Sequence, residues 1–171
     1  MNRLDLESAV LVVGFGNSLM ADDGFGSEVI DALRRPGLPV GMTVAVVPDV
    51  LRLYSVWSGQ RAVWMVDAVA LGDDPGTIHR FDHDALMDLP ARAGSAHHLD
   101  FAECLRWLLH SNPDLACARF RLWGAEPAQV SARSGLSRVV ATAVAPVVQE
   151  IRWSATSRAA GMAGVGLRGA S

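Results

Sequence analysis

The sequence contains no lysine, and all 15 of its basic residues are arginine. This absence excludes a Walker phosphate loop, an enzyme that works through a lysine Schiff base, and a Ser–Lys catalytic pair. Cysteine is also scarce, with only Cys104 and Cys117. Two thiols cannot supply a disulfide framework or a cysteine-rich zinc site, so we expect both to be reduced.

Charged residues and long apolar runs are limited too. Charged residues make up 19% of the chain and the net charge is −3, so there is no broad basic surface for nucleic acid. No apolar run approaches the ~18 residues that span a bilayer. The first residues lack the basic region, apolar core and cleavage site of a signal peptide. We therefore expect a cytoplasmic protein that binds neither nucleic acid nor membrane.

Hydrophobic residues make up half of the 171 positions, which suits one compact domain. We expect this single domain to span residues 1–153. The composition then changes, because residues 154–171 are rich in Gly, Ala and Ser. We expect this last segment to be a flexible tail.

Apolar runs and periodicity predict alternating strands and helices. The expected strands are 9–13, 42–47, 62–66, 77–81 and 120–123, and the expected helices are 27–35, 49–57, 99–110 and 136–151. Pro146 lies inside the last helix and should kink or interrupt it. Alternation of this kind indicates an α/β fold, specifically a three-layer α/β/α sandwich with a mostly parallel twisted sheet of about five strands.

Acidic residues follow the first three expected strands. Asp67 ends an apolar run, and burial of its carboxylate would be costly without a cation or hydrogen-bond donors. Asp22 and Asp23 lie in the glycine-rich loop after the first strand, where one carboxylate could point inward while the other caps a helix. Asp49 follows the second strand. Ligands of such sheets bind at the carboxyl ends of the strands, although loop hydrogen bonds could equally explain each of these acids.

Four of the five histidines occur in two groups. His97 and His98 precede an amphipathic helix, and neutral imidazole with two carboxylates is a suitable ligand set for Ni or Zn. His79, Asp82, His83 and Asp84 form a rival cluster, which we interpret as an exposed strand and turn.

The glycine loop also permits a dinucleotide-binding interpretation. Gly14-x-Gly16 follows a strand, but position 19, where a third glycine is expected, is Leu19. Asp49 could imitate the ribose-binding acid, although it lies about 33 residues beyond Gly16 rather than ~20. Asp22 and Asp23 would also repel a pyrophosphate. These departures make dinucleotide binding the weaker alternative.

The motifs together resemble those of the [NiFe]-hydrogenase maturation endopeptidases. The resemblance covers about residues 9–152, in the right order. It is carried by Gly14-Phe-Gly-Asn-Ser-Leu-Met-Ala-Asp-Asp-Gly-Phe-Gly26, Val66-Asp67-Ala68, Pro75-Gly-Thr77, Ser95-Ala-His97-His98-Leu99 and Gly135-Leu-Ser137.

This resemblance implies an endopeptidase that removes the C-terminal extension of a nickel-loaded hydrogenase large-subunit precursor. It places the catalytic, nickel-contacting positions at Asp23, Asp67 and His97, and His98 could replace His97. The nickel is carried by the substrate, and the protein's own affinity for it is left open. The implied partner is the large-subunit precursor, and we expect the protein itself to be a monomer.

One segment departs from the family pattern. Many members carry a G-T-A-G-like sequence after the second strand, where this chain has Val47-Pro-Asp-Val50. A non-catalytic factor that docks on the precursor or binds nickel therefore stays open as an alternative. Asp49 could act there as a base or an orienting group.

Overall fold

A computed structural model describes residues 9–89 and 101–166. Five strands form one sheet in the order β2-β1-β3-β5-β4. They are β1 (Val10–Phe15), β2 (Met42–Val47), β3 (Ala62–Ala68), β4 (Ile78–Phe81) and β5 (Arg119–Ala125). All neighbours are parallel except β4, which pairs antiparallel with β5 at one edge. The predicted mostly parallel sheet of five strands is confirmed.

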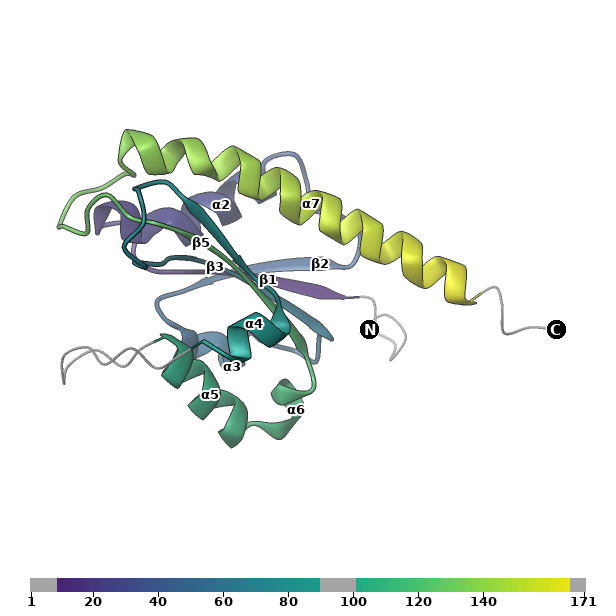
Figure 1. The fold of residues 1–171 in the computed structure, drawn as a ribbon. Helices are drawn as coiled ribbons and strands as arrows, with labels where there is room; N and C mark the ends of the chain where they lie inside the picture. Colours follow the sequence, from purple (N-terminus) through teal and green to yellow (C-terminus); the bar gives the residue numbers. More distant parts are fainter. Residues whose placement is uncertain (1–8, 90–100, 167–171) are drawn as a thin grey trace.

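Helices cover both faces of this sheet (Figure 1). One face is covered by α2 (Phe25–Arg34) and α7 (Arg138–Gly166), while the opposite face carries the other α-helices (Figure 1). These are α3 (Leu53–Val56), α4 (His83–Met87), α5 (Phe101–Ser111) and α6 (Pro113–Ala116). The 3₁₀ turns η1 (Ala21–Gly24) and η2 (Val50–Arg52) follow β1 and β2. The three-layer prediction is confirmed, although α4 and α6 had no expected counterpart.

The central strands explain why the sequence shows continuous apolar runs rather than alternation. All six residues of β1 are buried. Successive side chains on a strand point to opposite faces, so Val12 packs in the core under α2 and α7 whereas Val13 packs in the core under α5. A strand covered on both faces needs an apolar side chain at every position.

The last helix is longer than the sequence suggested. α7 runs without interruption past Pro146, which lies on the exposed side of the helix. Thr142, whose carbonyl loses its N–H partner at this proline, is exposed as well. The helix continues to Gly166, into the segment expected to be a tail, and Ala155 packs in the core. Among the described residues, no helix combines the length and apolar character needed to cross a membrane.

A close approach at Gly26 fixes the start of α2. A Cβ atom there would collide with the backbone of Phe15 and with the carbonyl oxygen of Val66. Only glycine allows α2 to start so near the ends of β1 and β3. Since η1 directly precedes α2 and contacts β3, this approach brings the acidic loop beside the end of β3.

Candidate functional site

A pocket of about 350 Å³ opens at the carboxyl ends of β1, β2 and β3. Three of the aspartates singled out in the sequence, Asp23, Asp49 and Asp67, line it together. The other residues that line it are Phe15, Gly16, Pro48, Val50, Leu51, Ala68, Phe101 and Cys104. The topology thus gathers acids that are up to 44 positions apart, because parallel strands end at the same edge of the sheet.

Asp67 lies near the end of β3, after five buried residues. Its Oδ1 atom accepts a hydrogen bond from the backbone N–H of Ala68 at 2.8 Å. Burial raises the pKa of Asp67 to about 7; the Ala68 hydrogen bond opposes this rise, while the negative charge of Asp23 adds to it. Asp67 therefore exchanges a proton near neutral pH, which suits a general base or a cation ligand.

Asp23 points to the same pocket from the loop after β1. Its Oδ2 atom accepts a hydrogen bond from the backbone N–H of Asn17 at 2.7 Å, and Asn17 Oδ1 accepts one from Leu19 N–H at 2.9 Å. The backbone of Asp23 also fills the space beside Gly16, whose φ of 101° favours glycine. An acid packed against the loop leaves little room for a pyrophosphate, which counts against dinucleotide binding.

Asp22 has a different environment although it is adjacent to Asp23. Its side chain is fully buried and accepts hydrogen bonds from the backbone N–H groups of Ala128, Gln129 and Ser137 at 2.9, 3.0 and 2.6 Å. Burial alone would raise the pKa of Asp22, but the hydrogen bonds from these three residues lower it below 3.8. Asp22 therefore anchors the loop before α7, and Asp23 is left to face the pocket.

The backbone conformation just before the two acids is strained. Ala21 is the one non-glycine residue with positive φ, at 51°, among those that the structure describes. Its N–H donates to Arg133 O at 2.6 Å, and Arg133 N–H donates to Leu19 O at 3.0 Å. These bonds to the loop before α7 hold Ala21 in a conformation that turns the chain sharply ahead of Asp22 and Asp23.

Asp49 lies on the rim of the pocket. It follows Pro48 in an extended conformation, with φ −157° and ψ 169°, and its side chain makes no capping hydrogen bond to η2. The residue is exposed. Its carboxylate is thus available to a molecule that enters the pocket, and within residues 9–89 and 101–166 no side-chain hydrogen bond or ion pair holds it in one orientation.

His97 and His98 lie outside the described residues. Phe101, four positions after His97, lines the pocket and packs edge-on against Phe15 with ring centroids 5.9 Å apart. In the part of the chain that the structure describes, no group of three His, Cys, Asp or Glu side chains could hold a metal ion. A metal shared with Asp23 and Asp67 would need a further ligand.

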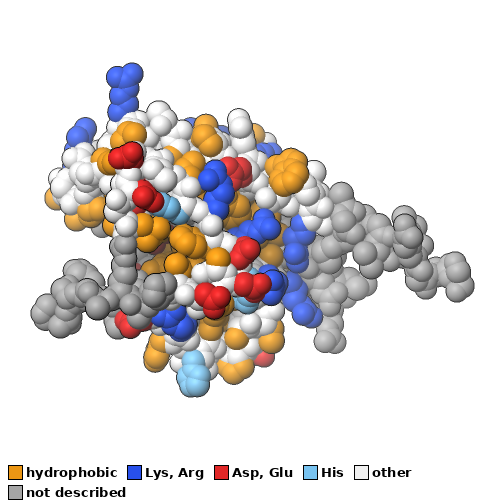
Figure 2. Space-filling model, viewed as in Figure 1, with side chains coloured by type: hydrophobic (Ala, Val, Ile, Leu, Met, Phe, Trp, Pro, Cys, Tyr) orange, Lys and Arg blue, Asp and Glu red, His pale blue; other side chains and the backbone are white. Residues whose placement is uncertain are grey.

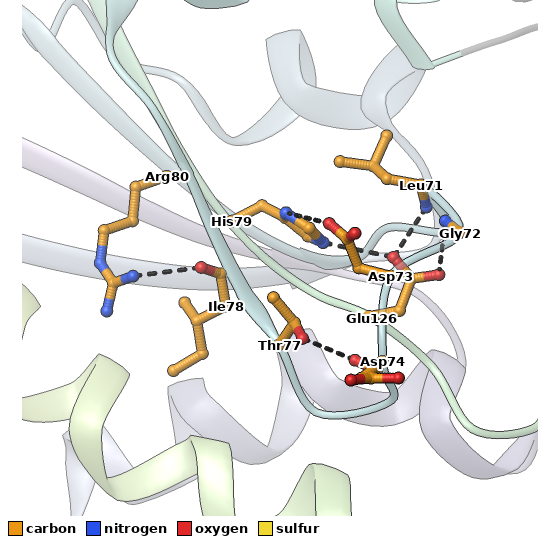
Figure 3. Close-up of polar contacts among 9 residues, drawn as sticks. All are labelled: Leu71, Gly72, Asp73, Asp74, Thr77, Ile78, His79, Arg80 and Glu126. Carbon is orange, nitrogen blue, oxygen red and sulfur yellow. Dashed lines mark hydrogen bonds and ion pairs between the residues drawn. The ribbon is translucent and has the colours of Figure 1, made fainter.

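The rival histidine cluster is divided among local structural roles. Asp82 caps α4 by accepting a hydrogen bond from Ala85 N–H, and His83 Nδ1 accepts one from Phe120 N–H at 3.2 Å. His79 lies 3.2 Å from Glu126, through Nε2 and Oε2 (Figure 3). The expected strand is confirmed at His79 in β4, and Asp82 and Asp84 are exposed as expected. The expected turn is wrong, because Asp82 caps a helix that begins at His83.

Glu126 is a buried acid that sequence analysis missed. Its two carboxylate oxygens accept the backbone N–H groups of Leu71 and Gly72 at 2.8 and 3.0 Å (Figure 3). Burial would raise the pKa of Glu126, but these bonds and the one to His79 lower it. The sequence pattern could have identified this residue, since Glu126 follows the apolar end of β5 just as Asp67 ends the apolar run of β3. Glu126 holds the loop that follows β3.

Comparison with known proteins identifies the fold and the family. Residues 49–153 match the family model for hydrogenase maturation protease. A Methanocaldococcus jannaschii protein described as a candidate hydrogenase maturation protease is 31% identical over 145 residues, which cover 83% of this chain and 93% of that protein. The hydrogenase expression/formation protein HoxM of Cupriavidus necator is 30% identical, over 82% of this chain and 71% of its own length.

A solved structure agrees with these sequence matches. The [NiFe] hydrogenase maturation protease HybD of Thermococcus kodakarensis superposes with a TM-score of 0.70 at 25% identity. The superposition covers 86% of this chain and 99% of that protein. The fold therefore matches over nearly the whole length of that protease.

Proposed function

This chain belongs to the hydrogenase maturation protease family, and on that premise we propose that it removes the C-terminal extension of a nickel-loaded [NiFe]-hydrogenase large-subunit precursor. The family consists of peptidases, so the chain is a peptidase that acts in hydrogenase maturation. The finer statement, that nickel in the precursor is what the protein recognises, is supported by one observation. Asp23 and Asp67 line one pocket, where the charge of Asp23 helps to raise the pKa of Asp67.

Two carboxylates in one pocket favour a cation that arrives from outside. Without a cation, the pair repel each other and Asp67 holds a proton near neutral pH. A cation displaces that proton and binds both carboxylates. The approach of the precursor to the pocket is therefore favourable only when the precursor carries a cation. We propose His97 as the third ligand, because Phe101, which lines the pocket, follows it by four positions.

The same arrangement suggests how the peptide bond is hydrolysed. Nickel held by the precursor polarises the scissile carbonyl or activates a water molecule. A carboxylate accepts the proton of the attacking water and passes it to the leaving amine. Asp67 loses its own proton when it binds the cation, so Asp49 on the rim is the candidate base in the loaded complex. We further propose that the protein acts as a monomer in the cytoplasm.

A second function is kept open by one sequence feature. The segment Val47–Val50 departs from the G-T-A-G-like pattern that the family resemblance implies, and its residues Pro48, Asp49 and Val50 line the pocket on the β2 side. A chain that docks on the precursor without cutting it would keep Asp23 and Asp67 but lack turnover. Precursor binding without any processing would favour this alternative.

Cleavage of a purified precursor tests the proposal. The wild-type protein should convert a nickel-loaded large-subunit precursor to a shorter product, seen as a mobility shift and as the mass of the released peptide. Asp67→Ala and His97→Ala should abolish the shift. Asp114→Ala and His110→Ala, which replace the same residue types at exposed positions elsewhere, should leave it unchanged. Failure of the wild type to cut any nickel-loaded precursor from its own cell would refute the proposal.

A further inference from the structure

The strand that leads into the pocket, β2, lies at an edge of the sheet and lacks the features that normally protect such an edge. Its six residues, Met-Thr-Val-Ala-Val-Val, include no charged residue, proline or glycine. The opposite edge strand, β4, has only four residues and carries His79 and Arg80. Proteins usually guard exposed edges with short strands or charged side chains, so β4 is protected. Among the residues that the structure describes, no strand pairs with the outer side of β2.

The pairing of β2 with β1 identifies the groups that face outward. Val10 N–H donates to Gly41 O, and Val10 is aligned with Met42. In a parallel ladder with this register, alternate residues of β2 direct their N–H groups at β1, while Val44 and Val46 direct theirs away. Within residues 9–89 and 101–166, no hydrogen bond from another element reaches the backbone of Val44 or Val46. We call these outward-facing groups of Val44 and Val46 the β2 edge.

The β2 edge is continuous with the candidate active site. Directly after Val47, the chain forms the rim of the pocket with four consecutive residues, Pro48–Leu51. A peptide paired along β2 would cover about 20 Å at ~3.3 Å per residue and would lead directly to this rim. A peptidase has to hold a flexible segment extended, and strand addition does so through backbone groups.

We propose that the β2 edge binds the peptide on one side of the scissile bond as an added strand, and so delivers that bond to the pocket. This inference rests on the proposed function. Backbone pairing fixes the conformation of the peptide with little demand on its side chains, and the pocket then selects for the metal. The partner is a segment of the precursor rather than a second copy of this chain, because the edge runs into the pocket.

Matched substitutions at Val44 test the proposal. Val44→Pro removes the outward N–H and is tolerated at an edge position, whereas Val44→Thr keeps that N–H and the β-branched shape. The probe is a fluorescein-labelled peptide that contains the C-terminal extension and the six residues before it, measured by anisotropy. Val44→Pro should weaken binding about 3- to 10-fold, with a matching rise in KM for precursor cleavage, and Val44→Thr should match wild type.

The outcomes separate this inference from the proposed function. Equal peptide affinities for Val44→Pro, Val44→Thr and wild type would overturn the inference about the β2 edge, even if the precursor is cleaved. The absence of any peptide binding would overturn it as well. Peptide binding that is sensitive to Val44→Pro without cleavage would support the edge and count against the peptidase reaction. A wild-type dimer that Val44→Pro dissociates would also overturn it. If Val44→Pro does not fold, hydrogen exchange on the wild type decides: the peptide should slow exchange at Val44 and Val46, and unchanged rates would contradict the proposal.

Discussion

The carboxyl groups of Asp23 and Asp67 line one pocket and interact electrostatically. Burial is the main cause that raises the pKa of Asp67 to about 7, and the charge of Asp23 raises it further. In the free protein, Asp67 therefore holds its proton up to about pH 7. This relationship makes the pocket an energetically poor place for two bare carboxylates and a good place for a cation.

The raised pKa of Asp67 predicts that Asp67→Asn stabilises the protein at alkaline pH. Above its unfolded-state pKa of 3.8, Asp67 is ionised when unfolded but holds its proton when folded up to about pH 7. Stability therefore falls as pH rises through this window, by up to about 4 kcal/mol. Urea unfolding should show Asp67→Asn increasingly more stable than wild type from pH 4 to pH 8. A constant difference across this range would contradict the account.

The same Asp→Asn substitution should lower stability at Asp22 but abolish precursor cleavage at Asp23. Asp22→Asn disturbs three buried backbone hydrogen bonds and should cost about 2–4 kcal/mol of folding free energy at pH 7. That loss should shrink as pH falls below 3.8, where the wild type loses the stabilisation of ionised Asp22. Asp23→Asn should keep wild-type stability within about 1 kcal/mol and abolish precursor cleavage. Chemical denaturation and the cleavage assay, run on both variants, check this; a reversal of the two effects would exchange their assigned roles.

The close approach of α2 to the sheet at Gly26 can be tested by comparison with Gly37, which has open space around it. Gly26→Ala places a methyl group on the backbone of Phe15 and Val66, and should cost at least about 3 kcal/mol. Gly37→Ala meets nothing within 4 Å, so only its positive φ of 80° is penalised, by about 1 kcal/mol. Thermal unfolding measures both. Equal losses would mean that the approach of α2 to the sheet is not tight.

Glu126 should contribute far more to stability than Glu150, which is only half-buried. Glu126→Gln removes the charge that binds Leu71 and Gly72 N–H and should cost about 2–3 kcal/mol. Glu150 pairs with Arg80 near the surface, so Glu150→Gln should cost below about 1 kcal/mol. Denaturant midpoints compare the two variants. A small loss for Glu126→Gln would show that the loop after β3 is held by other contacts.

The sequence predicted the sheet well because β1 and the first five residues of β3 form continuous buried runs. The residues alone predicted that one of the acids at positions 22 and 23 would point inward and the other would cap a helix, and the family resemblance assigned the nickel-contacting position to Asp23. The expected cap is wrong, because neither η1 nor α2 has a side-chain capping hydrogen bond. The residues alone did not decide which acid would be buried. That choice depends on the N–H groups of Ala128, Gln129 and Ser137, which lie more than 100 positions away. Long-range hydrogen bonds of this kind leave no local pattern.

Two other differences have local causes. The helix that begins at His83 is only one turn long and depends on the Asp82 cap, so it shows no periodicity. The end of α7 is rich in alanine, a strong helix former, but its glycines and serines suggested a tail. The positions of His97 and His98 lie outside the described residues, so the role of His97 stays a prediction.

Cleavage of one precursor in its nickel-loaded and nickel-free forms tests the central claim most directly. The account predicts that the wild-type protein releases the C-terminal extension from the loaded form and leaves the nickel-free form intact. Equal cleavage of both forms would show that Asp23 and Asp67 do not sense a cation carried by the substrate, and would contradict the account.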